Sequence, residues 1–248
     1  MDNISKRSKK KRSTGLTMMM DKGMSVRQAE DFISSSHEFT DIVKLGFGTA
    51  LITPNLKEKI KLYKDNKIHV YPGGTLFELF EAKNELNKYK NFLDKNGFEM
   101  VEISDGSIDI EHDKKCNYIR DFSNNFRVIS EVGSKSITAR TNSSEWIESM
   151  QNELNAGSWK VIAEARESGN TGIFNSNGSI KSELINTIIN NINAENIIWE
   201  APKKDQQVWF INRFGSNVNL GNISNNDVIS LECMRNGLRS DTFNHFMI

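Results

Sequence analysis

Residues 100–106 read MVEISDG, a short apolar run that ends in polar residues and glycine. Eight runs of this kind occur along the chain, and they begin near Gly15, Ile42, His69, Met100, Arg127, Lys160, Ile197 and Val218. The intervals between their starts are 27, 27, 31, 27, 33, 37 and 21 residues. Each interval is close to the length of one strand, one crossover helix and two short loops. The pattern therefore predicts a strand–helix unit that repeats eight times.

The segments between these runs have the apolar spacing of helices that pack on a sheet. Leu184, Ile185 and Ile188 form one such stripe. Ser25 is in position to be an N-cap, and Gly97 follows the last residue of another expected helix. Eight parallel strands that alternate with eight helices in about 250 residues predict an α/β fold, a single (β/α)8 TIM barrel. An open, doubly wound sheet is the alternative, although such sheets usually have fewer strands.

The charge of the chain is balanced overall but uneven along its length. The 248 residues include 32 Lys and Arg against 32 Asp and Glu, and residues 1–14 hold six of the bases and one acid. The rest has 26 positive and 31 negative side chains, a net charge of −5, so we expect no general affinity for nucleic acid. We expect residues 1–14 to be a basic, disordered tail and residues 15–248 to form the barrel.

The sequence also bears on the cellular compartment. Its first residues are charged, and no apolar run approaches the roughly 20 residues of a membrane span, so we expect neither a signal peptide nor an anchor. Cys116 and Cys233 lack C-x-x-C spacing, which fits buried thiols in a reducing compartment. We therefore expect a cytoplasmic protein without a membrane partner.

Ionisable residues cluster where six of the expected strands end. Side chains alternate along a strand, so Glu102 shares a face with Ser104, and Glu164 shares a face with Arg166. In a barrel of this kind, the C-terminal ends of the strands form the active-site face. The charged residues expected there are six acids and four bases: Asp21, Glu102, Asp105, Glu131, Glu164 and Glu200, with Lys22, Lys44, Lys135 and Arg166.

The excess of two negative charges at this expected mouth equals the charge of one divalent cation. Carboxylate oxygens favour a hard ion, and Mg²⁺ typically takes one or two carboxylates together with substrate oxygens and waters. The alternative is a set of buried ion pairs that serve only the fold. The four histidines are widely separated and lack ligand spacing, so a zinc site is not expected.

The glycine-containing turns suggest where an anion could bind. They match neither a Walker loop nor a dinucleotide fingerprint, and no serine nucleophile elbow occurs. Ser168-Gly169 instead has the character of a tight turn whose backbone N–H groups could receive an anion. Gly221 and Asn222 lie in the last expected strand, where barrels often bind phosphate, and packing at a tight turn is the alternative for both.

The strand ends closely resemble those of the phosphosulfolactate synthase family. The matching stretches follow one another in order through nearly the whole chain after the basic segment. They are GLTMMMDKG (15–23), VKLGFGT (43–49), VYPGGTLFE (70–78), VEISDGS (101–107), SEVGSK (130–135), EARESG (164–169), EAPKKDQQVWFI (200–211), FGSNVNLGNI (214–223) and VISLECMRNGLRSDTF (228–243). Relatives that share these stretches include plant heat-stress proteins.

The resemblance implies a Mg²⁺-dependent (β/α)8 barrel that adds sulfite to phosphoenolpyruvate, early in one route to coenzyme M. By its place in the SEVGSK stretch, Lys135 corresponds to the general acid. The residues implied around Mg²⁺ are Glu102, Asp105, Glu131 and Glu164. The residues implied for binding the substrates are Lys22, Lys44, Arg166, Ser168, Gly169, Gly221 and Asn222, with Glu200 as a further contact or a reserve ligand.

Two alternatives to this activity stay open. One is a non-catalytic barrel relative of the heat-stress-associated type, which predicts an altered mouth. The other is a lyase that uses another nucleophile on a phosphorylated enol or keto acid. The chain also departs from the family pattern at Ser134, where members often carry a second lysine before the one that matches Lys135. A homo-oligomer is possible, because the helical faces give no decisive patch either way.

Overall fold

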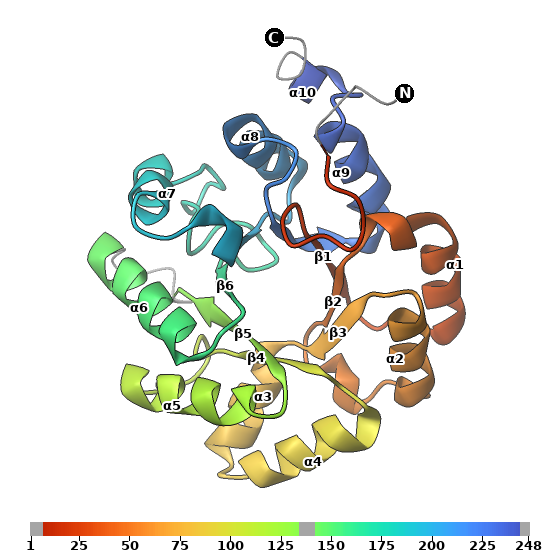
Figure 1. Cartoon of the computed structure of the whole chain (residues 1–248), viewed down its shortest axis with the longest axis vertical. Helices are drawn as coiled ribbons and strands as arrows, with labels where there is room; N and C mark the ends of the chain where they lie inside the picture. Colours follow the sequence, from red (N-terminus) through yellow and green to blue (C-terminus); the bar gives the residue numbers. More distant parts are fainter. Residues whose placement is uncertain (1–6, 134–141, 244–248) are drawn as a thin grey trace.

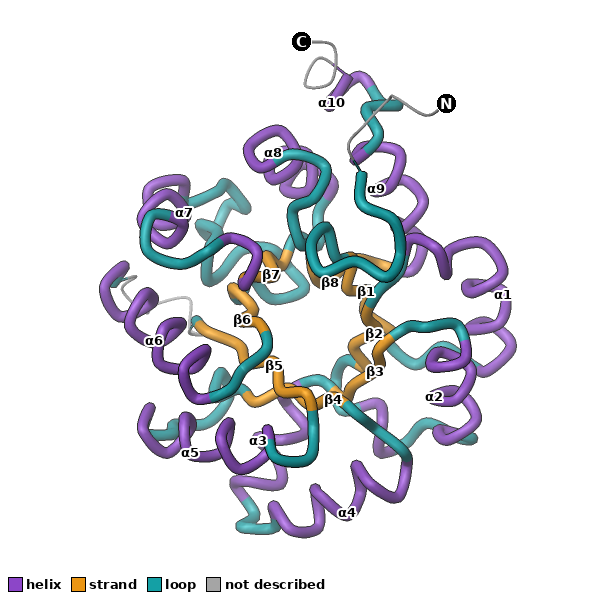
Figure 2. Tube along the Cα trace, in the orientation of Figure 1, coloured by secondary structure: helices purple, strands orange, loops and turns teal. Residues whose placement is uncertain are grey.

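Eight parallel strands form a nearly closed barrel in the computed structural model, which describes residues 7–133 and 142–243 (Figures 1 and 2). The order of paired strands is β3-β2-β1-β8-β7-β6-β5-β4, and β3 lies next to β4 at the seam. The strands are β1 (Thr17–Asp21), β2 (Ile42–Leu45), β3 (His69–Pro72), β4 (Met100–Ile103), β5 (Arg127–Val132), β6 (Lys160–Ala163), β7 (Ile197–Glu200) and β8 (Leu220–Ser224). The predicted (β/α)8 barrel is therefore confirmed, and the open-sheet alternative is excluded.

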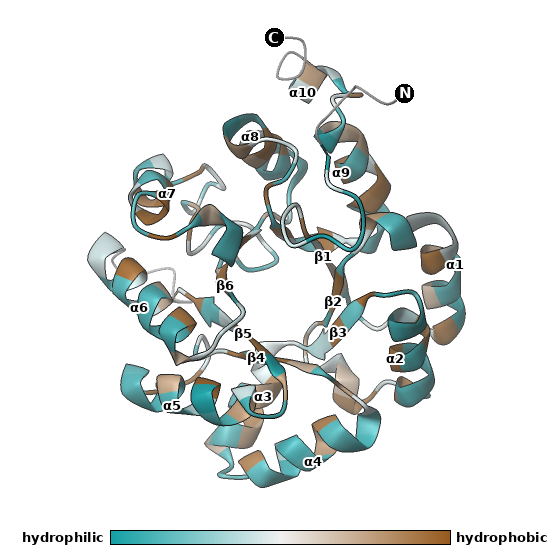
Figure 3. Cartoon of the chain, in the orientation of Figure 1, coloured by the Kyte–Doolittle hydropathy of each residue, from teal (hydrophilic) through white to brown (hydrophobic). Residues whose placement is uncertain are grey.

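Helices surround this barrel on its outer side (Figure 2). They are α1 (Val26–Ser36), α2 (Leu56–Asp65), α3 (Gly74–Ala82), α4 (Leu86–Asn96), α5 (His112–Ser123), α6 (Ser143–Ala156), α7 (Ser182–Ile189), α8 (Lys204–Phe214), α9 (Val228–Arg235) and α10 (Ser240–Phe243). Apolar and hydrophilic segments alternate around them (Figure 3). Among the described residues, every helix is too short or too polar to cross a membrane.

The sequence signals for element ends agree with the structure in most places. The side chain of Ser25 caps α1 by accepting a hydrogen bond from the backbone of Gln28, and Gly97 ends α4 in the left-handed conformation. Six strands begin at the expected residue, whereas β1 and β8 begin two residues later than expected. For β1 the reason is Gly15, whose φ of +74° is incompatible with an extended strand.

The inside of the barrel changes from apolar to charged along its axis. Nearer the end at which the strands begin, the interior is filled by a buried apolar layer. Its residues are Leu16, Met18, Ile42, Tyr71, Met100, Ile129, Ile162 and Ile198. Side chains two positions apart on a strand share a face, so the next inward position of five strands is also inside. Those five positions hold Lys44, Glu102, Glu131, Glu164 and Glu200. Strand periodicity thus places a charged layer directly above the apolar one.

The described part of the basic N-terminal segment, residues 7–14, packs against the barrel. The guanidinium of Arg7 pairs with Glu232 on α9 at 3.1 Å, and that of Arg12 pairs with Asp41 before β2 at 3.2 Å. The side chains of Arg7 and Arg12 are only 7% and 3% exposed. Composition showed the positive run but not these carboxylate partners, which come from distant parts of the chain.

Arg7→Ala is expected to lower the free energy of unfolding by about 1.5–3 kcal/mol at pH 7, because it removes hydrogen bonds between charged groups. Burial favours a higher pKa for Glu232, but Arg7 outweighs it and holds that pKa below its ordinary value. The stabilisation is therefore present above the unfolded pKa of about 4.3 and is lost as the pH falls through the lower folded value.

Urea unfolding of the wild type and of Arg7→Ala, at pH 7 and at progressively lower pH, measures the difference in their free energies of unfolding. Arg27→Ala, on the exposed face of α1, is the matched control and should change stability by less than about 0.5 kcal/mol. If the difference in the free energy of unfolding between the wild type and Arg7→Ala stays constant as the pH falls to about 3, the assigned ion pair is contradicted.

Candidate active site

A cavity of about 520 Å³ opens at the carboxyl end of the barrel. Its polar and charged lining residues come from strand ends and loops around the barrel. They are Lys44, Thr75, Glu102, Ser107, Glu131, Glu164, Arg166, Glu167, Ser168, Glu200 and Asn222. This is the face on which (β/α)8 barrels carry their active sites. Its volume lies in the range of small-molecule sites.

Lys44 lines this cavity and contacts three carboxylates. From β2, its Nζ is 3.0 Å from Glu102 Oε2, 3.3 Å from Glu131 Oε2 and 3.5 Å from Glu200 Oε1. Burial opposes the charged form of this side chain, but the three carboxylates outweigh burial and raise the pKa of Lys44 well above its ordinary value. Lys44 is therefore a permanent cation under physiological conditions.

Glu102 is fixed by the first residue of α3. Its Oε1 accepts a hydrogen bond of 2.8 Å from the backbone N–H of Gly74, where the helix dipole favours a negative charge. A Cβ at position 74 would lie 2.1 Å from Ser104 Oγ and 2.6 Å from Glu102 Oε1. Glycine is therefore required at this position for the helix end to approach the carboxylate.

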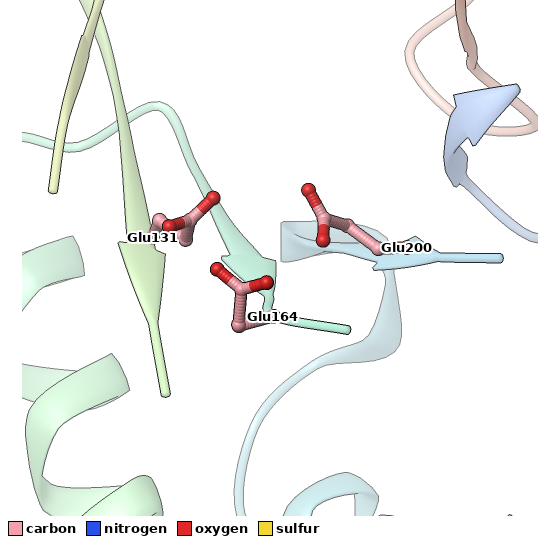
Figure 4. Close-up of side chains that lie close together, drawn as sticks. All are labelled: Glu131, Glu164 and Glu200. Atoms are coloured by element: carbon pink, nitrogen blue, oxygen red, sulfur yellow. The ribbon is translucent and has the colours of Figure 1, made fainter. Parts of the chain in front are cut away.

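Glu131, Glu164 and Glu200 form a second group in the same cavity, at the ends of β5, β6 and β7 (Figure 4). Among the described residues, these three alone bring carboxylate oxygens within 4.8 Å of one another in a potential metal site. Burial and the charge of Glu131 raise the pKa of Glu200 to about 7, although Lys44 counteracts them. A buried, all-oxygen donor set fits a hard divalent cation.

Three non-glycine residues that line the cavity have a left-handed backbone: Phe47, Arg166 and Asn222 have φ values of 57°, 54° and 55°. In β8, an extra residue relative to β1 produces a bulge between the pairs Thr17–Leu220 and Met19–Ile223. The bulge turns Asn222 towards the cavity, and its buried Oδ1 has no hydrogen-bond partner within the described part of the chain. Such backbone strain is concentrated at functional sites.

The structure brings most of the residues selected from the sequence to this cavity. Those that line it are Lys44, Glu102, Glu131, Glu164, Arg166, Ser168, Glu200 and Asn222. Glu200 belongs to the carboxylate triad, although the sequence suggested it only as a substrate contact or reserve ligand. Lys135 lies outside the described residues.

Five other selected residues lie outside the lining of this cavity. Asp21 pairs with Lys59 at 2.7 Å and accepts hydrogen bonds from the backbone N–H groups of Gly23 and Met24. Asp105 pairs with Lys115 at 2.9 Å beside a neighbouring cavity, and Lys22 pairs with Glu167 at the exposed rim. The carbonyl of Gly169 accepts a hydrogen bond of 2.9 Å from the Gln206 side chain. A Cβ at Gly221 would lie 2.5 Å from Met18 Cε, so this glycine permits packing inside the barrel. Strand-end position alone could not separate these side chains from those that face the cavity.

Lys115 is an important residue that sequence reasoning missed. From α5, its buried ammonium donates to the backbone carbonyl of Glu131 at 2.7 Å and pairs with Glu153 at 2.8 Å. Burial opposes its charged form, but Glu153 and Asp105 outweigh burial and raise the pKa of Lys115. The available signal was its helical spacing beside the buried Cys116 and Ile119, which places it on the inner face of the helix.

Comparisons with known proteins agree with this geometry. The family model described as (2R)-phospho-3-sulfolactate synthase matches residues 5–241. A phosphosulfolactate synthase of Bacillus subtilis is 42% identical over 96% of this chain and 95% of its own length. Another, of Methanocaldococcus jannaschii, is 43% identical over 92% of this chain and 94% of its own.

Among solved structures, 3-keto-L-gulonate-6-phosphate decarboxylase from Vibrio cholerae has a TM-score of 0.55. The alignment covers 94% of this chain and 98% of that one, at 7% identity, and it shows a shared fold alone. The assignment to a family rests on the matched residues 5–241 and on the two synthases. The chain therefore belongs to the (2R)-phospho-3-sulfolactate synthase family of enzymes.

Proposed function

We propose that this enzyme adds sulfite to phosphoenolpyruvate to give (2R)-phospho-3-sulfolactate, with Mg²⁺ as its cofactor. The observation that carries the proposal is the buried ring of carboxylates around Lys44, in a chain 42–43% identical to two phosphosulfolactate synthases. These residues place a cation and carboxylate oxygens on the wall of a cavity of suitable volume, at the active-site end of the barrel.

The reaction forms one bond between sulfur and carbon. A lone pair of sulfite sulfur attacks the methylene carbon of phosphoenolpyruvate, and the π electrons of the C=C bond move towards the substrate carboxylate. A proton then adds to the carbon that bears the phosphate ester, and the phosphate group is retained. The protein therefore has to bind two anions, stabilise the charge that develops on the carboxylate and deliver one proton.

Glu131, Glu164 and Glu200 are the residues proposed to hold Mg²⁺, because their oxygens lie together and are buried. When bound, Mg²⁺ supplies electrostatic stabilisation of the charge that develops on the substrate carboxylate. The family resemblance implied Glu102 as a Mg²⁺ ligand, but Glu102 is proposed to hold Lys44 in position and not the metal. Its two oxygens contact the Gly74 N–H and the Lys44 ammonium. This distribution of roles assigns Asp105 to the ion pair with Lys115.

Positive and polar groups on the cavity wall are proposed to bind the anionic substrates. Lys44 contributes a positive charge to this wall. Arg166 and Ser168 lie after β6, and the β8 bulge brings the side chain of Asn222 to the cavity. A guanidinium suits phosphate or sulfite because it donates two parallel hydrogen bonds.

Lys135 is proposed as the general acid from its match to the SEVGSK stretch of the family. Phosphorus NMR of the enzyme with phosphoenolpyruvate, sulfite and Mg²⁺ should detect phosphosulfolactate. Lys135→Ala should lower the turnover rate by roughly 10²–10⁴-fold, because the proton donor is removed, while the unfolding midpoint stays unchanged.

The control for this variant is Lys95→Ala, in the last turn of α4, which should keep the wild-type rate. A wild-type enzyme that binds phosphoenolpyruvate but forms no sulfonate product would favour a different nucleophile. Failure to bind phosphoenolpyruvate at all would favour the non-catalytic type of relative. A near-normal rate for Lys135→Ala would remove that residue from the mechanism.

Glu164→Gln keeps the shape of the side chain and removes its negative charge. It should raise the Mg²⁺ concentration that gives half-maximal rate by roughly tenfold or more, because one ligand of the triad becomes neutral. Calorimetric titration with Mn²⁺ should show the same loss of affinity in the absence of substrate.

Glu148→Gln is the matched control, since Glu148 is exposed on α6 and lies outside the lining of the active-site cavity. Its metal dependence should equal that of the wild type. Equal metal dependence in Glu164→Gln and the wild type would exclude Glu164 from the metal site.

A further inference from the structure

A second cavity, of about 610 Å³, lies at the opposite end of the barrel. Residues 10–13 form one of its sides. Other parts of its lining precede or begin the strands, including Asp41 before β2, Glu99 before β4 and Arg127 at the start of β5. Because all the strands are parallel, their starts lie together at the end away from the carboxylate ring. The cavity is therefore separate from the candidate active site.

The lining of this cavity is strongly positive. Among the described residues it includes two acids, Asp41 and Glu99, and six bases: Lys10, Lys11, Arg12, Lys64, Lys67 and Arg127. The formal excess is thus six minus two, or four positive charges. Both acids are already engaged, because Asp41 pairs with Arg12 and Glu99 pairs with Lys64. Within the described ranges, the other four bases have no carboxylate oxygen within ion-pair distance.

Several of these cations are held in place by the protein itself. Lys10 Nζ donates to the backbone carbonyls of His37 and Asn66, at 2.5 and 3.1 Å. The guanidinium of Arg127 lies 4.8 Å from the ring centre of Trp159. Burial lowers the pKa of Lys10, so a bound anion would stabilise its charged form. Charges fixed before binding cost little conformational entropy when a ligand arrives.

We propose that this cavity binds a small oligophosphate, such as tripolyphosphate or the phosphate chain of a nucleotide. Linked phosphates carry several negative charges within a few ångströms, which matches four excess positive charges around one concave space. A cavity of this volume suits a small molecule, and the positive charges around it raise the local concentration of anions. The site gives the basic segment before β1 a binding role that is separate from the synthase reaction.

Calorimetric titration with tripolyphosphate, in a chelator and without divalent metal, tests the proposal. Under these conditions the carboxylates of the active-site cavity repel anions. We expect one site per chain, with affinity that falls as salt rises. The double variant Lys11→Glu and Lys67→Glu should weaken binding by roughly tenfold or more, because it reverses two charges on the cavity wall.

The matched control is Lys9→Glu with Lys57→Glu, two exposed lysines outside the cavity, which should bind within about threefold of the wild type. Arg166→Ala, in the other cavity, should also leave binding unchanged. Equal losses in both double variants, loss in Arg166→Ala, or no binding at millimolar tripolyphosphate would each overturn the proposal. Titration with ATP compares a nucleotide with free tripolyphosphate as the source of the phosphate chain. Similar affinities for the two compounds support recognition of the phosphate chain, whereas binding of ATP without binding of tripolyphosphate contradicts it.

Discussion

The ion pairs of Lys44 with Glu102, Glu131 and Glu200 are the interaction on which the active-site end of the barrel depends. These four side chains come from β2, β4, β5 and β7, so only a closed barrel brings them together. A buried charge without a partner is strongly destabilising, whereas mutual pairing offsets much of the desolvation cost. The apolar layer next to them, towards the start of the strands, excludes water from that side and keeps their electrostatic interactions strong.

This arrangement leaves more negative than positive charge around one buried ammonium. Glu164 adds another carboxylate beside Glu131 and Glu200, so a divalent cation would relieve repulsion that Lys44 balances only in part. The raised pKa of Glu200 reflects the same repulsion together with burial. Family membership and electrostatics therefore support the same proposal of a metal-assisted synthase.

The repeat of short apolar runs was sufficient to predict the barrel, because strand and helix periods recur at regular intervals along the chain. Alternation within strands also predicted the inward carboxylates, such as Glu102 and Glu164. It could not predict that Asp105 turns away to meet Lys115, since the partner lies on a helix ten residues later. Asn222 was selected for its position, but the bulge that turns it depends on pairing with β1, which no local pattern reveals.

The most direct test of the carboxylate ring as a metal and substrate site is anomalous diffraction from crystals soaked with Mn²⁺ and phosphoenolpyruvate. One manganese peak is expected in the barrel mouth, with oxygens of Glu131, Glu164 and Glu200 around it and phosphoenolpyruvate beside Lys44. Phosphoenolpyruvate bound elsewhere, or a mouth without manganese in which Lys44 still contacts all three carboxylates, would contradict this assignment.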